Sequence, residues 1–414
     1  MSAEPPPPAP APAPEENGQR NRKRDITLFV VSAVLPVPWL VAHAIGGLSL
    51  PSEAIAPMAG LAILGGAFLL SWATELAERD IPQSLALLVL ALISVLPEYA
   101  VDLTFALRAP EQPEYAHYAV ANMTGANRLL IGLGWASVTL VACHKAGSSA
   151  LEIEPSHRVE IRYLIYATLY SFLVPLDGYL NPIDAIVLLA LFLAYVRAAM
   201  QGESYEVELV GPPAIMAQEF DDFGRRAWAI LLFAFAGYAI FISAEPFAEG
   251  LVHTGREWDI DEFLLVQWVA PLASESPEFV IAILFAARLR GGMGLGALIS
   301  SKVNQWTLLV GALPIAFCIA SMSLRGLPLD ARQTEELYLT SAQSLLATLL
   351  ICNLEITRLE AVMLAALFGV QLVFPSPDVR IAFCVLYLAI FLGLLIHSPI
   401  RRRALLDLLK NPPR

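Results

Sequence analysis

Two short apolar segments each place a glutamate directly after a proline. Residues 94–108 read SVLPEYAVDLTFALR, and residues 274–288 read SESPEFVIAILFAAR. At an offset of 180 residues, the identical pairs are Ser94 and Ser274, Pro97 and Pro277, Glu98 and Glu278, Phe105 and Phe285, Ala106 and Ala286, and Arg108 and Arg288. Proline inside a helix removes one backbone hydrogen bond and frees a carbonyl about one turn earlier. A freed carbonyl, a serine hydroxyl and a carboxylate are hard oxygen ligands, which suit Na⁺ or Ca²⁺.

Both glutamates lie in segments that are apolar enough to sit inside a membrane. A carboxylate there costs about 2.5–3.5 kcal/mol on insertion scales, so an ionisable group in a span is a functional candidate. We therefore predict that Glu98 and Glu278 bind a cation. The alternative is a structural role, either at a helix end or in an ion pair with Arg128 or Lys302.

Each glutamate has a second acid on the same helix face. Asp102 follows Glu98 by four residues, and Glu275 precedes Glu278 by three. Residues at these spacings are neighbours on a helix surface. Two neighbouring carboxylates repel each other, which favours their sharing a proton, so both acids are candidate proton sites. The alternative for each is a hydrated or salt-bridged side chain.

The composition makes the whole chain an integral membrane protein. Of its 414 residues, 57% are hydrophobic and 15% are charged, and the mean hydropathy is +0.62. Soluble domains have about 45–50% apolar and about 25% charged residues. The apolar runs are long and continuous, which favours an all-α fold and excludes a β-barrel. Twelve candidate spans lie near residues 26–46, 54–77, 82–107, 115–142, 160–176, 182–199, 226–247, 260–287, 292–319, 335–353, 358–374 and 379–398.

Several other classes of protein are excluded. A net charge of −12 without a long basic block argues against nucleic-acid binding. The four cysteines lie in or beside apolar runs without metal-type spacing: Cys143, Cys318, Cys352 and Cys384. The chain has no His-Glu-x-x-His or Gly-x-Ser-x-Gly motif, which argues against an intramembrane enzyme. We expect no cofactor, and no partner beyond the lipid bilayer and the transported cations.

The chain divides into two membrane halves with polar tails. We expect a disordered Pro-rich tail at 1–24, an N-terminal half at 25–199, an acidic linker at 200–225, a C-terminal half at 226–398 and a basic tail at 399–414. The linker is either a solvated connection or a cation-sensing loop. With both termini in the cytoplasm, 19 of the 26 Lys and Arg residues lie on the inner side and five on the outer side. This bias predicts a multi-pass protein of the cell (inner) membrane, without a cleaved signal peptide.

The matched segments run through the membrane in opposite directions. They lie in the third and eighth expected spans, and an odd offset of five spans reverses the direction of crossing. Inverted repeats of this kind are typical of secondary transporters, whose sites lie near the bilayer midplane between the repeats. Glu98 and Glu278 are therefore expected to face each other there.

These segments resemble the calcium/cation antiporter superfamily, whose best-known members are sodium/calcium exchangers. Each half of that family carries an α-repeat of the form G-T-S-x-P-E on one helix and G-N-x-x-G-S-N on the next. Here the first element reads ISVLPE at 93–98 and ASESPE at 273–278, and the second reads ANMTGAN at 121–127 and GALISSK at 296–302. The resemblance implies a ten-helix core of two inverted five-helix halves plus about two extra helices. The α-repeats would cover about 90–135 and about 270–312.

The resemblance also implies which side chains hold the ion. Matching positions give Glu98, Glu278, Ser94, Ser274, Ser301, Gln305 and Asn127 as ion-binding residues. The two glutamates are the ligands expected to hold a metal ion most directly. Ala126 and Leu130 stand where the family has ligands in the first repeat, so that repeat has lost side-chain oxygens.

Two cations distinguish this sequence from the family pattern. Lys302 replaces the family asparagine, and Arg128 follows Asn127. At about 100° per residue, Lys302 can reach the site, whereas Arg128 points to the other side of its helix. We predict that Lys302 pairs with Glu275 or Glu278 and shifts coupling from sodium toward protons, since a buried amine can stand in for a sodium ion. The alternative is that Lys302 extends along the helix to a lipid headgroup.

The predicted function is that of a secondary cation antiporter working by alternating access. It would move Ca²⁺ or another cation, with Na⁺ or H⁺ as the counter-ion. The alternative is a relative that binds an ion or partner without transporting it or with altered specificity, which the ligands lost from the first repeat would permit.

Overall fold

The computed structural model describes residues 14–45, 52–78, 80, 95–201 and 209–410, and these residues are mostly helical. Before residue 200 the α-helices are α1 (Pro14–Val34), α2 (Val37–Ile45), α3 (Ser52–Glu78), α5 (Leu96–Arg108), α6 (Glu114–Leu129), α7 (Ala136–Ala146), α8 (Arg158–Ser171) and α9 (Pro182–Ala199). After it they are α10 (Pro212–Glu219), α11 (Asp222–Glu257), α12 (Glu262–Ala287), α13 (Gly291–Asn304), α14 (Val310–Ser321), α15 (Ala331–Ile351), α16 (Arg358–Val373), α17 (Pro377–His397) and α18 (Pro399–Lys410). The shorter elements are the 3₁₀ turns η2 (Pro155–His157) and η3 (Val174–Asp177), the π-helical turns η1 (Leu130–Trp135) and η4 (Gln305–Leu309), and the strands β1 (Ala150–Glu152), β2 (Tyr179–Leu180), β3 (Leu327–Pro328) and β4 (Glu355–Thr357).

The all-α membrane fold is confirmed. Nine helical stretches among the described residues are long and apolar enough to cross a membrane, and they correspond to nine of the twelve expected spans. The other three expected spans also contain helices. α15 is long but polar on one face, α16 has only 16 residues, and the part of the third span before residue 95 lies outside the described residues.

Two expectations about polar segments need correction. The tail expected to be disordered through residue 24 is helical from Pro14, because proline is tolerated at the first turn of a helix and no proline follows before the first span. The first span is itself broken between α1 and α2, where Pro36 follows Val34. The acidic linker at 200–225 contains the short helix α10 and the start of α11, although residues 202–208 lie outside the described part.

The two halves repeat the same elements in the same order. The matching elements are α3 with α11, α5 with α12, α6–η1–α7 with α13–η4–α14, α8 with α15, and α9 with α16. Both π-helical turns fall after the second α-repeat element, with Leu130 and Gln305 beginning them at an offset of 175 residues. β1 pairs with β4 and β2 with β3, so exchanging the halves maps one ribbon onto the other. This correspondence is the inverted repeat in three dimensions.

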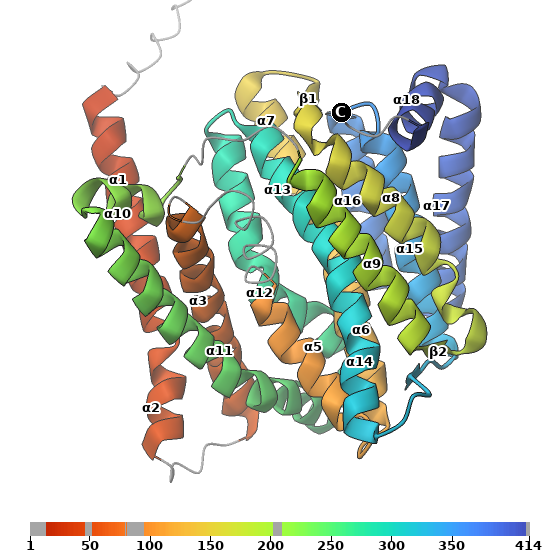
Figure 1. The fold of residues 1–414 in the computed structure, drawn as a ribbon, viewed down its shortest axis with the longest axis horizontal. Coiled ribbons are helices and arrows are strands. Elements are labelled where there is room, and N and C mark those ends of the chain that lie inside the picture. Colours follow the sequence, from red (N-terminus) through yellow and green to blue (C-terminus); the bar gives the residue numbers. More distant parts are fainter. Residues whose placement is uncertain (1–13, 46–51, 79, 81–94, 202–208, 411–414) are drawn as a thin grey trace, which may run out of the picture.

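The helices of the matched segments lie inside the bundle. α1, α2, α3, α10 and α11 stand together on one side, and α3 packs along most of α11 (Figure 1). α12 contacts both this group and α6, α7 and α13 of the remaining bundle. α6 approaches α12 so closely that a Cβ atom on Gly125 would overlap the carbonyl oxygen of Gln267. A glycine at this crossing brings the two α-repeats into direct contact.

Candidate functional site

The two matched glutamates approach each other from opposite halves. Glu98 lies in the first turn of α5 and is 1% exposed, whereas Glu278 follows Pro277 inside α12. Their carboxylates are close enough to repel each other electrostatically. Both side-chain oxygens of Glu98 and Oε2 of Glu278 are buried, and no described residue gives them a hydrogen bond. Buried polar atoms need a partner, so these oxygens require a cation, a proton or water.

Glu275 is the third acid of this cluster. It is fully buried on α12, and it interacts electrostatically with Glu98 and Glu278. The amide nitrogen of Gln305, in η4, donates a hydrogen bond to Oε1 of Glu275, while Oε2 of Glu275 has no described partner. In the described part of the chain, no three acid, imidazole or thiol side chains converge as a ready-made metal site. An ion held here therefore needs neutral oxygens in addition to carboxylates.

Neutral oxygens are available beside the acids. The Ser301 hydroxyl faces the Glu278 carboxylate without a hydrogen bond of regular geometry, and Oε1 of Gln305 is buried and unpartnered among the described residues. The Ser274 hydroxyl donates to the carbonyls of its own helix at 3.3 and 3.4 Å, to Ala270 and Pro271 respectively, which leaves its lone pairs available. Ser94, the matching residue of the first repeat, lies outside the described residues.

Asp102 lies one helical turn beyond Glu98 and is fully buried. The amide of Asn122, on α6, donates a 2.8 Å hydrogen bond to Oδ1 of Asp102. Oδ2 of Asp102 and Oδ1 of Asn122 have no described partner, and the charge of Asp102 acts on Glu98. The geometry places Asp102 next to the cluster, as the helix spacing predicted. The role of Asn122 as its partner was missed, although this asparagine stands in the α-repeat motif.

Lys302 is buried in the bundle, but its partner differs from the expected one. Its ammonium donates hydrogen bonds to the side-chain oxygen of Asn127 at 2.7 Å and to the Asn127 carbonyl at 3.1 Å. It also lies 4.6 Å from the ring centre of Trp306. Among the described residues it forms no ion pair with Glu275 or Glu278, although Glu275 attracts it electrostatically. Lys302 is 0% exposed, so the alternative of a headgroup-directed side chain is wrong.

This contact also changes the expected role of Asn127. Its amide nitrogen donates to the Met123 carbonyl at 2.8 Å, and its side-chain oxygen accepts from Lys302. Both ends of the side chain are therefore engaged by the protein. The structure places Asn127 as a holder of the lysine and not among the oxygens facing the acids, because α6 and α13 cross at these two positions.

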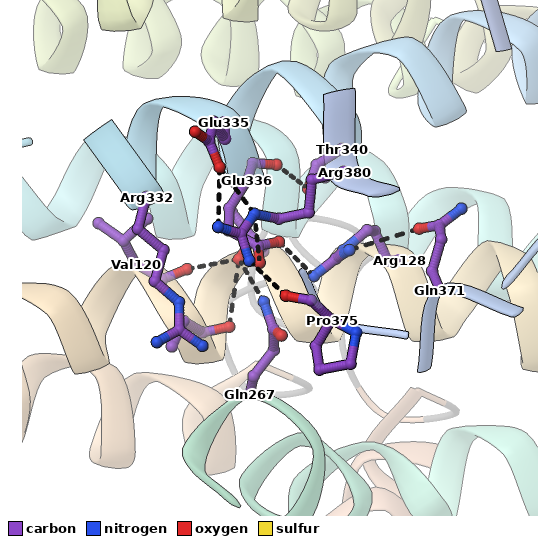
Figure 2. A network of polar contacts seen from close by, with 12 residues as sticks. Val120, Arg128, Gln267, Arg332, Glu335, Glu336, Thr340, Gln371, Pro375 and Arg380 are labelled. Atoms are coloured by element: carbon purple, nitrogen blue, oxygen red, sulfur yellow. Dashed lines mark hydrogen bonds and ion pairs between the residues drawn. The ribbon is translucent and has the colours of Figure 1, made fainter. Parts of the chain in front are cut away.

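Arg128 points away from the carboxylate cluster. It forms a buried ion pair of 2.5 Å with Glu336 of α15, and Arg380 of α17 approaches the same carboxylate at 3.8 Å. Figure 2 shows these three residues together with Glu335, which pairs with Arg380 at 2.7 Å. Arg128 therefore does form a charge pair, but with a residue that the sequence analysis missed. The only sequence signal was an acid in the polar helix α15.

A second charged cluster joins the ends of α3 and α11. Asp80 accepts hydrogen bonds from Arg225 at 2.9 and 3.0 Å and from Arg226 at 2.8 Å. Burial acts to raise the pKa of Asp80, but hydrogen bonds and charge from Arg226 and Arg225 outweigh it and lower the pKa below 3.8. The cluster holds together the two long helices that pack side by side.

Comparison with known proteins agrees with this architecture. The family model described as "Sodium/calcium exchanger protein" matches residues 52–201 and 228–376. A solved structure titled as the H⁺/Ca²⁺ exchanger CAX is 44% identical, covers 94% of this chain and 97% of its own, and superimposes with a TM-score of 0.88. A structure of the sodium-calcium exchanger NCX_Mj is 18% identical, covers 77% of this chain and 97% of its own, and has a TM-score of 0.53, which supports the fold alone.

One curated protein also matches. It is an uncharacterized membrane protein, MJ0091, from Methanocaldococcus jannaschii, which is 26% identical over 155 residues. The match covers 36% of this chain and 47% of that protein, so the chain spans about half the length of this curated relative.

Proposed function

This chain belongs to the sodium/calcium exchanger protein family and is a multi-pass cation antiporter, and we propose that it exchanges Ca²⁺ for H⁺. The proposal rests first on the carboxylates of Glu98 and Glu278, which come from the two inverted halves and have buried oxygens without described partners. It rests second on the 44% identity to a protein titled as an H⁺/Ca²⁺ exchanger. Alternating access would move the two halves about this site.

The donor set suits Ca²⁺, which takes six to eight oxygen ligands from carboxylates and neutral groups. Glu98 and Glu278 would supply the charge, and hydroxyl and amide oxygens would complete the shell. The neutral oxygens proposed for this shell are those of Ser94, Ser274, Ser301 and Gln305.

Protons would compete for the same oxygens. Three acids, Glu98, Glu275 and Glu278, repel one another in a buried volume, so they cannot all stay charged without a bound cation. Ca²⁺ would neutralise them when bound, and protons would neutralise them when it leaves. One set of side chains would then bind either ion but not both, which is the requirement for exchange.

Lys302 accounts for coupling to protons in place of sodium. It carries a fixed positive charge beside Glu275, and it occupies the oxygen of Asn127. A fixed cation repels a second monovalent cation nearby and removes one of its oxygen ligands. This arrangement disfavours a sodium site at the second α-repeat element, while leaving the glutamates that bind Ca²⁺ in place.

The proposal is tested by radiolabelled Ca²⁺ flux in proteoliposomes under imposed H⁺ or Na⁺ gradients. We expect a pH gradient to drive Ca²⁺ uptake, a sodium gradient to have little effect, and Glu98→Gln or Glu278→Gln to abolish uptake. Glu111→Gln, at an exposed loop position, is the matched control and should retain full flux. Flux driven by sodium alone would overturn the proton coupling. Calorimetric Ca²⁺ binding without flux under either gradient would instead indicate a non-transporting binder.

We also propose that the protein resides in the cell membrane with both termini in the cytoplasm, which the distribution of Lys and Arg supports. Protease added outside intact cells should then leave tags at both termini uncleaved.

A further inference from the structure

The C-terminal helix α18 closes a cavity at one end of the bundle, away from the carboxylate cluster. The cavity has a volume of about 390 Å³, within the range of small-ligand sites. One face of α18 lines it at the helical spacing i, i+3, i+4 and i+7. The lining residues are Ile400, Arg403, Ala404 and Asp407 of α18, Cys352 and Asn353 at the end of α15, and Arg158 at the start of α8.

α18 is fixed in place on both sides of this cavity. Near its start, Arg401 pairs with Glu360 of α16, and the Arg401 carbonyl accepts a 3.5 Å hydrogen bond from the Cys352 thiol. Near its end, the guanidinium of Arg162 donates a 2.5 Å hydrogen bond to the carbonyl of Leu408, whose side chain is buried. The cavity is therefore bounded by anchored elements.

The charges that face the cavity lack protein partners. Neither Arg158 nor Arg403 has a hydrogen bond or ion pair with any described residue, and both are exposed. Asp407 is also exposed and forms no described ion pair, so two guanidinium groups stand against one carboxylate. Oδ1 of Asn353 is buried and accepts no hydrogen bond within the described chain. The cavity thus offers two strong donors for an anion and two acceptors for hydroxyl groups.

The position of α18 identifies the source of such an anion. α17 is the most apolar of the membrane spans, and α18 begins two residues after it ends. Ile400 and Leu406 remain 69% and 43% exposed, as expected for a helix lying in the membrane interface with its apolar side chains toward lipid. A basic cavity at this depth meets phospholipid headgroups.

We propose that this cavity binds the headgroup of an anionic phospholipid of the phosphatidylglycerol class. Arg158 and Arg403 hold the phosphodiester, since guanidinium groups match phosphate oxygens. The headgroup hydroxyls donate to Oδ1 of Asn353 and to the Asp407 carboxylate, which explains why an acid and an unsatisfied amide oxygen line a basic site. The acyl chains leave past Ile400 into the bilayer.

The test is lipid retention by the full chain, measured by native mass spectrometry after reconstitution in equal amounts of phosphatidylglycerol and phosphatidylcholine. We expect retained phosphatidylglycerol to exceed phosphatidylcholine by at least about tenfold, and the double variant Arg158→Gln/Arg403→Gln to lose this preference, because each charge-assisted contact is worth about 1.5–3 kcal/mol. Arg402→Gln is the matched control. Arg402 is exposed on the same helix, bonds to the Ile396 carbonyl at 3.4 Å and does not line the cavity.

Further arms separate this proposal from its rivals. Phosphatidic acid, which has the phosphate without the glycerol hydroxyls, should be retained less than phosphatidylglycerol. Equal retention of all lipids by the wild-type chain, or unchanged preference in the double variant, would overturn the proposal. Displacement of the lipid by an equal concentration of soluble glycerol phosphate would also overturn it, since it would show a site for free anions. The wild-type competition decides the matter even where the double variant fails to fold.

Discussion

Lys302 and Asn127 hold equivalent positions in the two inverted repeats, and they bind each other. The Lys302 ammonium lies 2.7 Å from the side-chain oxygen of Asn127. In a symmetric pair of motifs two amides would meet here, and both would have oxygens to offer an ion. The lysine replaces one amide and occupies the other, so a single substitution removes two potential ligands.

Restoring the amide should therefore restore sodium dependence. In Lys302→Asn the fixed charge is lost and the Asn127 oxygen is released. We expect Ca²⁺ flux driven by a sodium gradient to rise by at least about tenfold over wild type, the ratio that corresponds to 1.4 kcal/mol of improved sodium binding. Flux in proteoliposomes under opposed Na⁺ and H⁺ gradients measures this.

Lys302→Met provides the control for this experiment, because it removes the charge without adding an oxygen. Sodium should support less flux in Lys302→Met than in Lys302→Asn. The same sodium and pH dependence in all three proteins would contradict the role of Lys302 in ion coupling.

The sequence was sufficient to predict the acids but not their neighbours. Glu98 and Glu278 repeat in matched context beside proline, and the repeat predicted that they would converge from opposite halves. The angle between Lys302 and Gln305 on one helix also predicted that the lysine would be buried near them. Which group it bonds depends on how α6 and α13 cross, and no spacing within a single helix reveals that crossing.

Arg128 shows the same limit from another direction. Its angle on α6 predicted that it would face away from the site, and it does. Its partner Glu336 lies in the opposite half, on a helix whose polarity made it a weak candidate for a membrane span. Burial of α15 on nearly all sides allows this polarity, and burial of that kind is a property of the assembled bundle.

Asp102 should tune the site without being a primary ligand. Asp102→Asn removes a negative charge that acts on Glu98 but keeps a polar side chain beside Asn122. With less repulsion, Glu98 tolerates its own negative charge at a lower pH, so Ca²⁺ uptake should extend to lower pH while maximal flux changes less than about threefold. Ca²⁺ flux measured across a pH series tests this. An unchanged pH profile, or complete loss of flux as in Glu98→Gln, would contradict the prediction.

The buried pair of Arg128 and Glu336 should matter for stability. Removing one partner leaves a buried charge uncompensated, which costs about 3–5 kcal/mol, so Arg128→Met should lower the free energy of unfolding by about that amount. Arg128→Met/Glu336→Leu removes both charges and should recover most of the loss, with Arg380 still paired to Glu335. Unfolding in detergent measures both variants.

Arg256 supplies the comparison for this buried pair. Its side chain is 54% exposed and pairs with Glu114 at 3.1 Å. Exposed pairs contribute about 0–1 kcal/mol, so Arg256→Met should change stability little. Equal losses in Arg128→Met and Arg256→Met would contradict the distinction between the buried and the exposed pair.

Asp80 should make the association of α3 with α11 depend on pH. Arg225 and Arg226 lower its pKa in the folded protein below 3.8, so the charged form stabilises the fold above its unfolded pKa of about 3.9. That stabilisation is lost as the pH falls through the lower folded pKa, when Asp80 takes up a proton. Asp80→Asn should therefore be less stable than wild type at pH 7, and the difference should shrink as the pH falls below 3.8. Thermal unfolding at a series of pH values, with the exposed Glu111→Gln as the control, measures it. A difference that stays constant down to acid pH would show that the carboxylate charge is not what joins the two helices.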